Sequence, residues 1–131
     1  FNKGPGLKGL TGHNDRRVVR GLAGEGDERA VLAPGVYTHR LRKYIGAYAA
    51  VMGGIDALTF TAGVGENNVE LRAEVAEGLE FLCIHVDGDR NAVRASGPHV
   101  ISPDGAPVTV LVVPTNEELE IARQSVALLE N

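Results

Sequence analysis

The chain has 131 residues, of which 44% are hydrophobic, and its formal net charge is −4 at pH 7. This length is enough to bury one core but short for two, so we expect a single domain over residues 1–131. The negative charge offers no broad basic surface, which argues against nucleic acid as a partner.

The chain also lacks the sequence features of a membrane or secreted protein. No apolar run approaches the roughly 20 residues that a membrane span needs, so no membrane partner is expected. Cys83 is the only cysteine and cannot close an internal disulfide, which favours a reducing, cytoplasmic location. The opening "FNKGPGLKGLTGHND" resembles the interior of a longer sequence, and we expect the chain to be a fragment.

The first half of the sequence predicts a loop and two helices. Residues 1–14 are rich in glycine and favour a loop, and helical spacing of apolar residues predicts a short helix over 15–23. Asp27 is a capping residue for a long helix that ends at Gly53. Pro34 lies within this pattern, so the helix either kinks there or begins there.

The last part of this long helix, "YIGAYAAVMGG", is apolar on nearly all sides. Such a pattern predicts burial on more than one side. We expect a sheet or a second subunit to cover it.

The second half predicts strands that alternate with helices. "IDALTF" (55–60) has the composition of a central strand, "VTVLVV" (108–113) that of a second buried strand, and 84–86 and 99–102 are shorter candidates. Helical patterns follow at 69–79, where every fourth residue is apolar, and over the last residues of the chain. This alternation predicts an α/β fold, a sheet flanked by helices.

Two strand-to-helix joints carry residues typical of helix capping. Asn67 with Glu70, and Thr115 with Glu118, have the spacing of a capping box. In open α/β sheets, ligands bind beyond the carboxyl ends of the strands, where both joints lie. Free backbone N–H groups at helix starts also favour an anion.

Each feature also has a purely structural interpretation. Gly63 and Gly65 could serve only a tight turn with positive φ, and "AGVGEN" matches neither the dinucleotide-binding glycine motif nor the P-loop. Glu117 could complement the helix dipole or hold Mg²⁺. Asp15 and its arginine neighbours could be a solvated helix start.

The sequence as a whole resembles the C-terminal part of the acetate kinases. The residues that carry the resemblance are "NKGPGLKGLTGHNDRR", "RKYIGAYAAVMGGIDALTFTAGVGEN", "RAEVAEGLEFL" and "VPTNEELEIAR", which occur in this order over nearly the whole chain. The resemblance implies a ribonuclease-H-like domain of the actin-like ATPase fold, as the incomplete second domain of a two-domain kinase. It also implies the reversible transfer of a phosphoryl group from ATP to acetate, which gives acetyl phosphate and ADP.

The resemblance also assigns roles to particular residues. It implies a nucleotide site formed by the residues that match the family's motifs: Asp15, Arg16, Arg17, Gly63, Val64, Gly65, Glu66 and Asn67. Glu117 corresponds to the magnesium-associated carboxylate. A homodimer formed through this domain is implied as well.

Other family features have no counterpart in the 131 residues. The catalytic groups of the family are expected upstream of Phe1, so we expect no turnover by this chain alone. Cys83 stands where the family usually has glycine. Two alternatives stay open, namely a nucleotide-binding or dimerisation module without chemistry, and a propionate or butyrate kinase.

Overall fold

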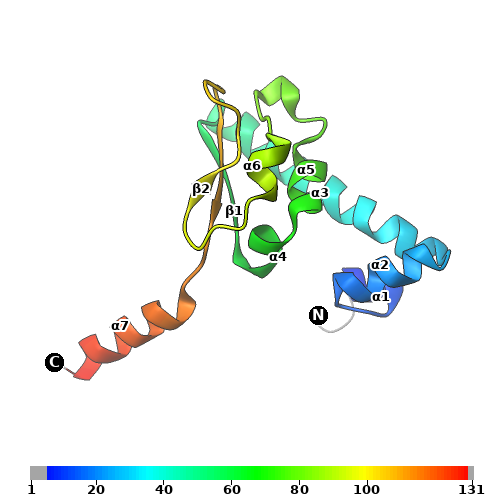
Figure 1. Cartoon of the computed structure of the whole chain (residues 1–131), viewed down its shortest axis with the longest axis horizontal. Coiled ribbons are helices and arrows are strands. Elements are labelled where there is room, and N and C mark those ends of the chain that lie inside the picture. The colour runs from blue at the N-terminus through cyan, green and yellow to red at the C-terminus, as the bar shows by residue number, and fades with distance from the viewer. Residues whose placement is uncertain (1–5, 130–131) are drawn as a thin grey trace. The chain divides into compact units, whose positions relative to one another are not determined.

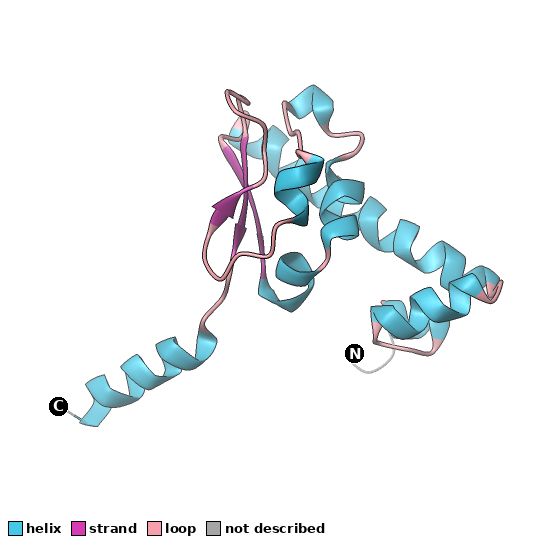
Figure 2. Ribbon diagram, viewed as in Figure 1, coloured by secondary structure: helices cyan, strands magenta, loops and turns pink. Residues whose placement is uncertain are grey.

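The computed structural model describes residues 6–129 and divides the chain into two compact units, Phe1–Gly54 and Ile55–Asn131. The described part of the first unit is helical, and the strands belong to the second unit (Figure 2). No helix within residues 6–129 is long and apolar enough to cross a membrane.

Three helices form the first unit: α1 (Leu7–Thr11), α2 (Arg16–Gly24) and α3 (Glu28–Met52). Their core contains Val19, Ala30 and Ala33, with partly buried leucines of α1 and α2 packed against it. The predicted loop over 1–14 is therefore wrong at 7–11, where the short α1 ends at Gly12 in the left-handed conformation. Residues 1–5 of that predicted loop lie outside the described part.

The two longer helices begin where their caps predict. The Asp15 carboxylate accepts a hydrogen bond from the Arg17 amide at 2.9 Å, and the Asp27 carboxylate accepts one from the Ala30 amide at 2.9 Å. Helix α3 continues through Pro34 and ends at Gly53, which has a φ of 77°. A start at Pro34 is therefore wrong, because the Asp27 cap already satisfies the first turn.

The apolar end of α3 is exposed rather than buried on several sides. Tyr44, Tyr48, Val51 and Met52 retain 50%, 63%, 85% and 65% of their surface, and Ala49 is the buried residue of this stretch. No cover for these side chains is present within residues 6–129.

The second unit contains a three-stranded mixed sheet with the strand order β1-β3-β2 (Figure 1). The strands are β1 (Ala57–Thr61), β2 (His99–Val100) and β3 (Thr109–Val113). Strand β3 pairs in parallel with β1 and antiparallel with β2. The α/β prediction is confirmed, but among the described strands the centre is β3 and not 55–60.

Helices connect and follow the strands of this unit. They are α4 (Ala62–Asn67), α5 (Val69–Ala76), α6 (Gly88–Ala92) and α7 (Glu117–Leu129), with a 3-10 turn, η1, at Glu80–Leu82. The buried face of α5 carries the predicted Leu71 and Val75, and Leu79 follows it into the core. The strand expected at 84–86 is not formed, because after η1 the chain buries Ile84 without a neighbouring strand to pair with it.

Candidate functional site

The two strand-to-helix joints lie at the same edge of the sheet. Because β1 and β3 are parallel, their last residues, Thr61 and Val113, are register partners. Figure 1 shows α4 following β1, and the segment that leads to α7 following β3, from this edge. The placement predicted from the sequence is therefore confirmed.

The joint after β1 is a short helix rather than a glycine turn. The positive φ, 58°, belongs to Ala62, whereas Gly63 and Gly65 lie within α4 without positive φ. A Cβ atom on Gly65 would lie 3.2 Å from the carbonyl carbon of Phe60, while one on Gly63 would meet open space. Gly65 therefore serves a close backbone approach, and the turn explanation for these two glycines is wrong.

A side chain of the first joint binds the second. Oε1 of Glu66 accepts hydrogen bonds from the Thr115 amide at 2.8 Å and from the Thr115 hydroxyl at 3.0 Å. This contact could not be predicted from the sequence, because its partners lie 49 residues apart. Glu66 thus bridges the ends of the two neighbouring strands.

The two predicted capping boxes are wrong by one residue each. Asn68 caps α5 by accepting a hydrogen bond from the Leu71 amide at 2.9 Å, while Nδ2 of Asn67 donates to the Gly63 carbonyl oxygen within α4. At α7, Asn116 accepts from the Leu119 amide at 3.0 Å. Thr115 precedes this cap, and its amide and hydroxyl donate to Glu66.

A buried arginine, which the sequence analysis did not single out, supports α4. The Arg72 side chain is 1% exposed, and its Nη1 donates to the carbonyl oxygens of Gly65 and Glu66 at 2.8 Å each. Its Nε and Nη2 donate to Oδ1 and the carbonyl oxygen of Asn91 at 2.7 and 2.8 Å. Burial lowers the pKa of Arg72.

One sequence signal points to this position. Residues 72, 75, 76 and 79 follow the i, i+3, i+4, i+7 spacing of a core-facing helix stripe, and Arg72 is the charged member of that stripe. A charge on such a stripe needs hydrogen-bond partners inside the protein, which the carbonyl groups supply.

In the first unit, Asp15, Arg16 and Arg17 are adjacent at the start of α2. Arg17 binds the Asp15 carboxylate through both Nε and Nη2, the latter at 2.7 Å from Oδ2. The side-chain hydrogen bond from Arg17 lowers the pKa of Asp15 to about 2. The Arg16 guanidinium lies 4.9 Å from the centroid of the Tyr37 ring, and its buried Nη1 has no hydrogen-bond partner among residues 6–129.

Glu117 is the first residue of α7 and is exposed. Within residues 6–129 no group of three or more His, Cys, Asp and Glu side chains is placed to hold a metal ion. A single exposed carboxylate still suits Mg²⁺, which commonly binds one or two carboxylates and completes its shell with water and substrate phosphates.

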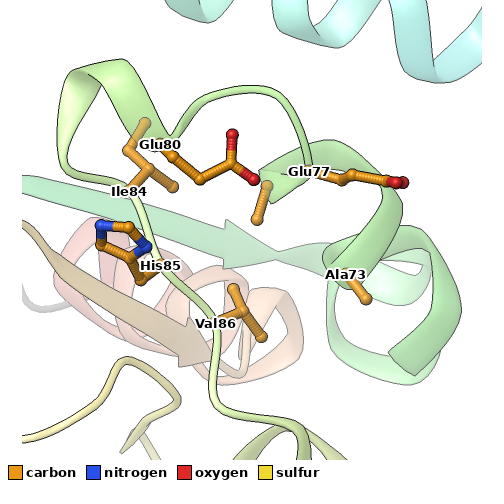
Figure 3. A pocket seen from close by; sticks show the side chains of 7 residues that line it. Ala73, Glu77, Glu80, Ile84, His85 and Val86 are labelled. Atoms are coloured by element: carbon orange, nitrogen blue, oxygen red, sulfur yellow. The ribbon is translucent and has the colours of Figure 1, made fainter.

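Of two pockets in the second unit, one lies beside the strand-to-helix joints and the other lies away from them. One adjoins the joints and is lined by residues of α4, α5, the segment after α6 and the ends of β2 and β3, including Glu66, Asn67, Arg72, His99 and Pro114. Another is lined by α5 and the segment after it, with Glu77, Glu80 and His85 among its side chains (Figure 3). This second pocket contains none of the predicted site residues.

The sequence profile of the acetokinase family matches residues 1–123. The chain belongs to this family. It is 60% identical over 125 residues to an acetate kinase of Leifsonia xyli subsp. xyli, which covers 95% of the chain and 32% of the relative. The chain therefore spans about a third of the length of the curated acetokinases that it matches.

Solved acetokinase structures have the same fold. An acetate kinase of Porphyromonas gingivalis matches 98% of the chain and 32% of its own length, with a TM-score of 0.85 and 43% identity. A propionate kinase of Francisella tularensis matches 92% of the chain and 30% of its own length, with a TM-score of 0.78 and 38% identity. The fold expected from the resemblance, that of the actin-like ATPases, is thereby confirmed.

The exposed cysteine has a backbone conformation that favours glycine. Cys83 has a φ of 60° after η1 and is exposed, so it is not a buried hydrophobic residue. Glycine adopts this left-handed conformation without steric cost, so glycine, which the resemblance leads us to expect at this position, would suit it.

Proposed function

We propose that the chain is part of an acetate kinase, which transfers a phosphoryl group reversibly between ATP and acetate. The observation that carries this proposal is the 60% identity to an acetate kinase over 95% of the chain. The position of both joints at the carboxyl ends of neighbouring parallel strands supports it, because ligands of open α/β sheets bind beyond such ends.

We further propose that this chain supplies part of the nucleotide and magnesium site as the C-terminal domain. One segment of the nucleotide site would be Asp15, Arg16 and Arg17. The segment that faces adenosine would be residues 63–67. The open space beside Gly63 supports a close approach of nucleotide to backbone. In phosphoryl transfer the protein chiefly positions the groups and neutralises charge.

Glu117 would hold Mg²⁺ directly or through water. When bound, Mg²⁺ neutralises charge on the transferred phosphoryl group. The exposure of Glu117 at the edge where both joints lie supports this role.

Activity is tested with the complete protein by trapping acetyl phosphate with hydroxylamine. We expect hydroxamate to form only when ATP and a carboxylic acid are both present. It should form faster with acetate than with propionate or butyrate. A preference for propionate would favour the rival acyl kinase, for which the likeness to a propionate kinase is the supporting observation. Absence of turnover with all three acids would refute the kinase proposal and favour a nucleotide-binding module.

The metal role has a matched control on the same helix. Glu117→Ala should lower kcat and raise the Mg²⁺ concentration needed for half-maximal rate, because it removes the carboxylate ligand. Glu118→Ala removes an equally exposed neighbouring carboxylate and should change neither value. Equal effects of the two substitutions would contradict the assignment.

The nucleotide residues are tested by calorimetry with Mg-ATP. Asp15→Ala and Asn67→Ala should each weaken binding, since one removes the Arg17 partner and the other the Gly63 contact. Unchanged affinity in both would show that ATP binds elsewhere.

The proposal includes a cytoplasmic homodimer. The exposed apolar end of α3, with Tyr48 and Val51 at 63% and 85% exposure, supports a face that a second subunit covers. Sedimentation of the complete protein should show a dimer, and Val51→Glu should shift it to monomer. A monomeric wild-type protein would refute the dimer.

A further inference from the structure

The Glu66 carboxylate binds Thr115, in the segment between β3 and α7. One oxygen, Oε1, accepts both the amide and the hydroxyl of Thr115, at 2.8 and 3.0 Å. Such paired hydrogen bonds to a charged acceptor are stronger than bonds between neutral groups. The side chain therefore connects α4 to the segment that precedes α7.

The backbone of the same residue is fixed from the other side. Nη1 of the buried Arg72 binds the carbonyl oxygens of Gly65 and Glu66, while Asn91 holds the rest of the guanidinium. The planar guanidinium fixes the directions of its donors. Glu66 is consequently held by Arg72 at its carbonyl group and by Thr115 at its carboxylate.

This connection matters because burial does not fix the position of α7. All residues from Glu117 to Leu129 are exposed, and α7 contains no buried residue. Thr115 lies two residues before Glu117, with the capping residue Asn116 between them. The contact with Glu66 is therefore a tether at the start of this helix.

We propose that Glu66 and Arg72 are positioning residues that hold Glu117 in a fixed relation to α4. The Glu66 side chain acts through Thr115, while its backbone remains part of the proposed nucleotide segment 63–67. The effect of these residues on turnover rests on the proposed function, in which Glu117 holds Mg²⁺. It assigns the two side chains a shared task, in which Arg72 orients the Glu66 backbone and Glu66 orients the start of α7.

The kinetic test uses the Mg²⁺ concentration for half-maximal rate in the complete enzyme at saturating ATP. Glu66→Ala should raise it roughly 3–10-fold, as expected for losing a solvent-accessible hydrogen bond to a charged group. Glu66→Gln should stay near the wild-type value, because an amide oxygen can still accept both hydrogen bonds from Thr115. Asp89→Ala, an exposed carboxylate on α6, is the control and should have no effect.

The outcomes separate positioning from direct binding. If Glu66→Gln is as impaired as Glu66→Ala, the charge itself is needed and Glu66 binds metal or substrate directly, which overturns the inference. An unchanged Mg²⁺ requirement in Glu66→Ala also overturns it.

Arg72 is tested through its coupling to Glu66. Arg72→Lys should raise the same Mg²⁺ value, and the double variant with Glu66→Ala should be no worse than the more impaired single variant, because both act through one connection. Effects that multiply would show that Arg72 acts independently and overturn its shared role. Arg90→Lys is the matched control, since Arg90 binds Asp104 and the Ser102 carbonyl oxygen instead.

Amide hydrogen exchange tests the tether without any assay of activity. The Thr115 amide donates to Glu66, so Glu66→Ala should accelerate its exchange roughly 3–10-fold, while the buried β3 amide of Val110 should not change. Equal Thr115 exchange in both proteins would refute the tether. If the complete protein lacks kinase activity but Thr115 exchange responds, the proposed function fails and the tether stands.

Discussion

Two glycines of α4 offer a sharp comparison because the same substitution meets different surroundings. Gly63 and Gly65 are both helical, and neither has positive φ. A Cβ atom at Gly65 would lie 3.2 Å from the Phe60 carbonyl carbon and 3.4 Å from its Cα, whereas Gly63 has nothing within 4 Å. Alanine at 65 must therefore displace backbone, and alanine at 63 need not.

The expected free energies follow from two opposing effects. Alanine is more favourable than glycine in a helix by roughly 0.8–1 kcal/mol, a gain open to both variants. Only Gly65→Ala also overpacks a close backbone contact, which typically costs about 1–3 kcal/mol. We expect Gly63→Ala to be up to about 1 kcal/mol more stable than wild type, and Gly65→Ala to be about 1–3 kcal/mol less stable than Gly63→Ala.

Urea denaturation followed by circular dichroism measures this difference directly. With a typical slope of about 1–3 kcal/mol per molar urea, the two midpoints should differ by about 1 M. The slopes should match, because neither substitution changes the surface exposed on unfolding. A Gly65→Ala midpoint equal to or above that of Gly63→Ala would refute the role assigned to Gly65.

Three further predictions concern local structure. Cys83→Gly should stabilise the protein by about 1 kcal/mol in thermal unfolding, since glycine relieves the left-handed conformation, and a lower stability would contradict this. Asn68→Ala should cost about 1 kcal/mol in urea denaturation and Asn67→Ala less, because Asn68 is the cap, and the reverse order would restore the predicted capping box. The Asp15 carboxyl should titrate with a pKa near 2 by NMR, and Arg17→Met should return this pKa toward 3.8. Because the folded-state pKa is lowered, the contribution of Asp15 to stability is complete above about pH 4 and is lost as the pH falls through about 2.

Much of the fold could be predicted because its signals are local. Asp15 and Asp27 accept hydrogen bonds two and three residues ahead, so the starts of α2 and α3 can be identified from short motifs. The apolar runs of β1 and β3 likewise identify strands without reference to distant residues.

The predictions that were wrong depend on contacts that a short stretch of sequence does not reveal. The glycines of α4 favoured a turn by propensity, yet both are helical, and Gly65 lies against the backbone of Phe60. The cap of α7 is Asn116, while Thr115 contacts Glu66, which lies 49 residues away in the sequence. The exposed end of α3 shows that an apolar pattern predicts burial without specifying the partner.

The same distinction applies to the candidate site. The sequence placed both joints at one edge of the sheet, because the carboxyl ends of parallel strands meet there. It did not reveal Arg72, whose partners at Gly65, Glu66 and Asn91 lie on other elements. Residue types and spacing therefore placed the two joints together, while the contacts that support α4 required the structure.

The buried guanidinium has an electrostatic consequence for any anion that approaches α4. Arg72 directs four hydrogen bonds to neutral oxygens and is 1% exposed, so solvent screens its charge weakly. A guanidinium in a protein keeps its proton, and this positive potential therefore persists at every pH at which the protein is folded. A phosphate at this edge of the sheet would feel a constant attraction whose source lies beneath the backbone rather than on the surface.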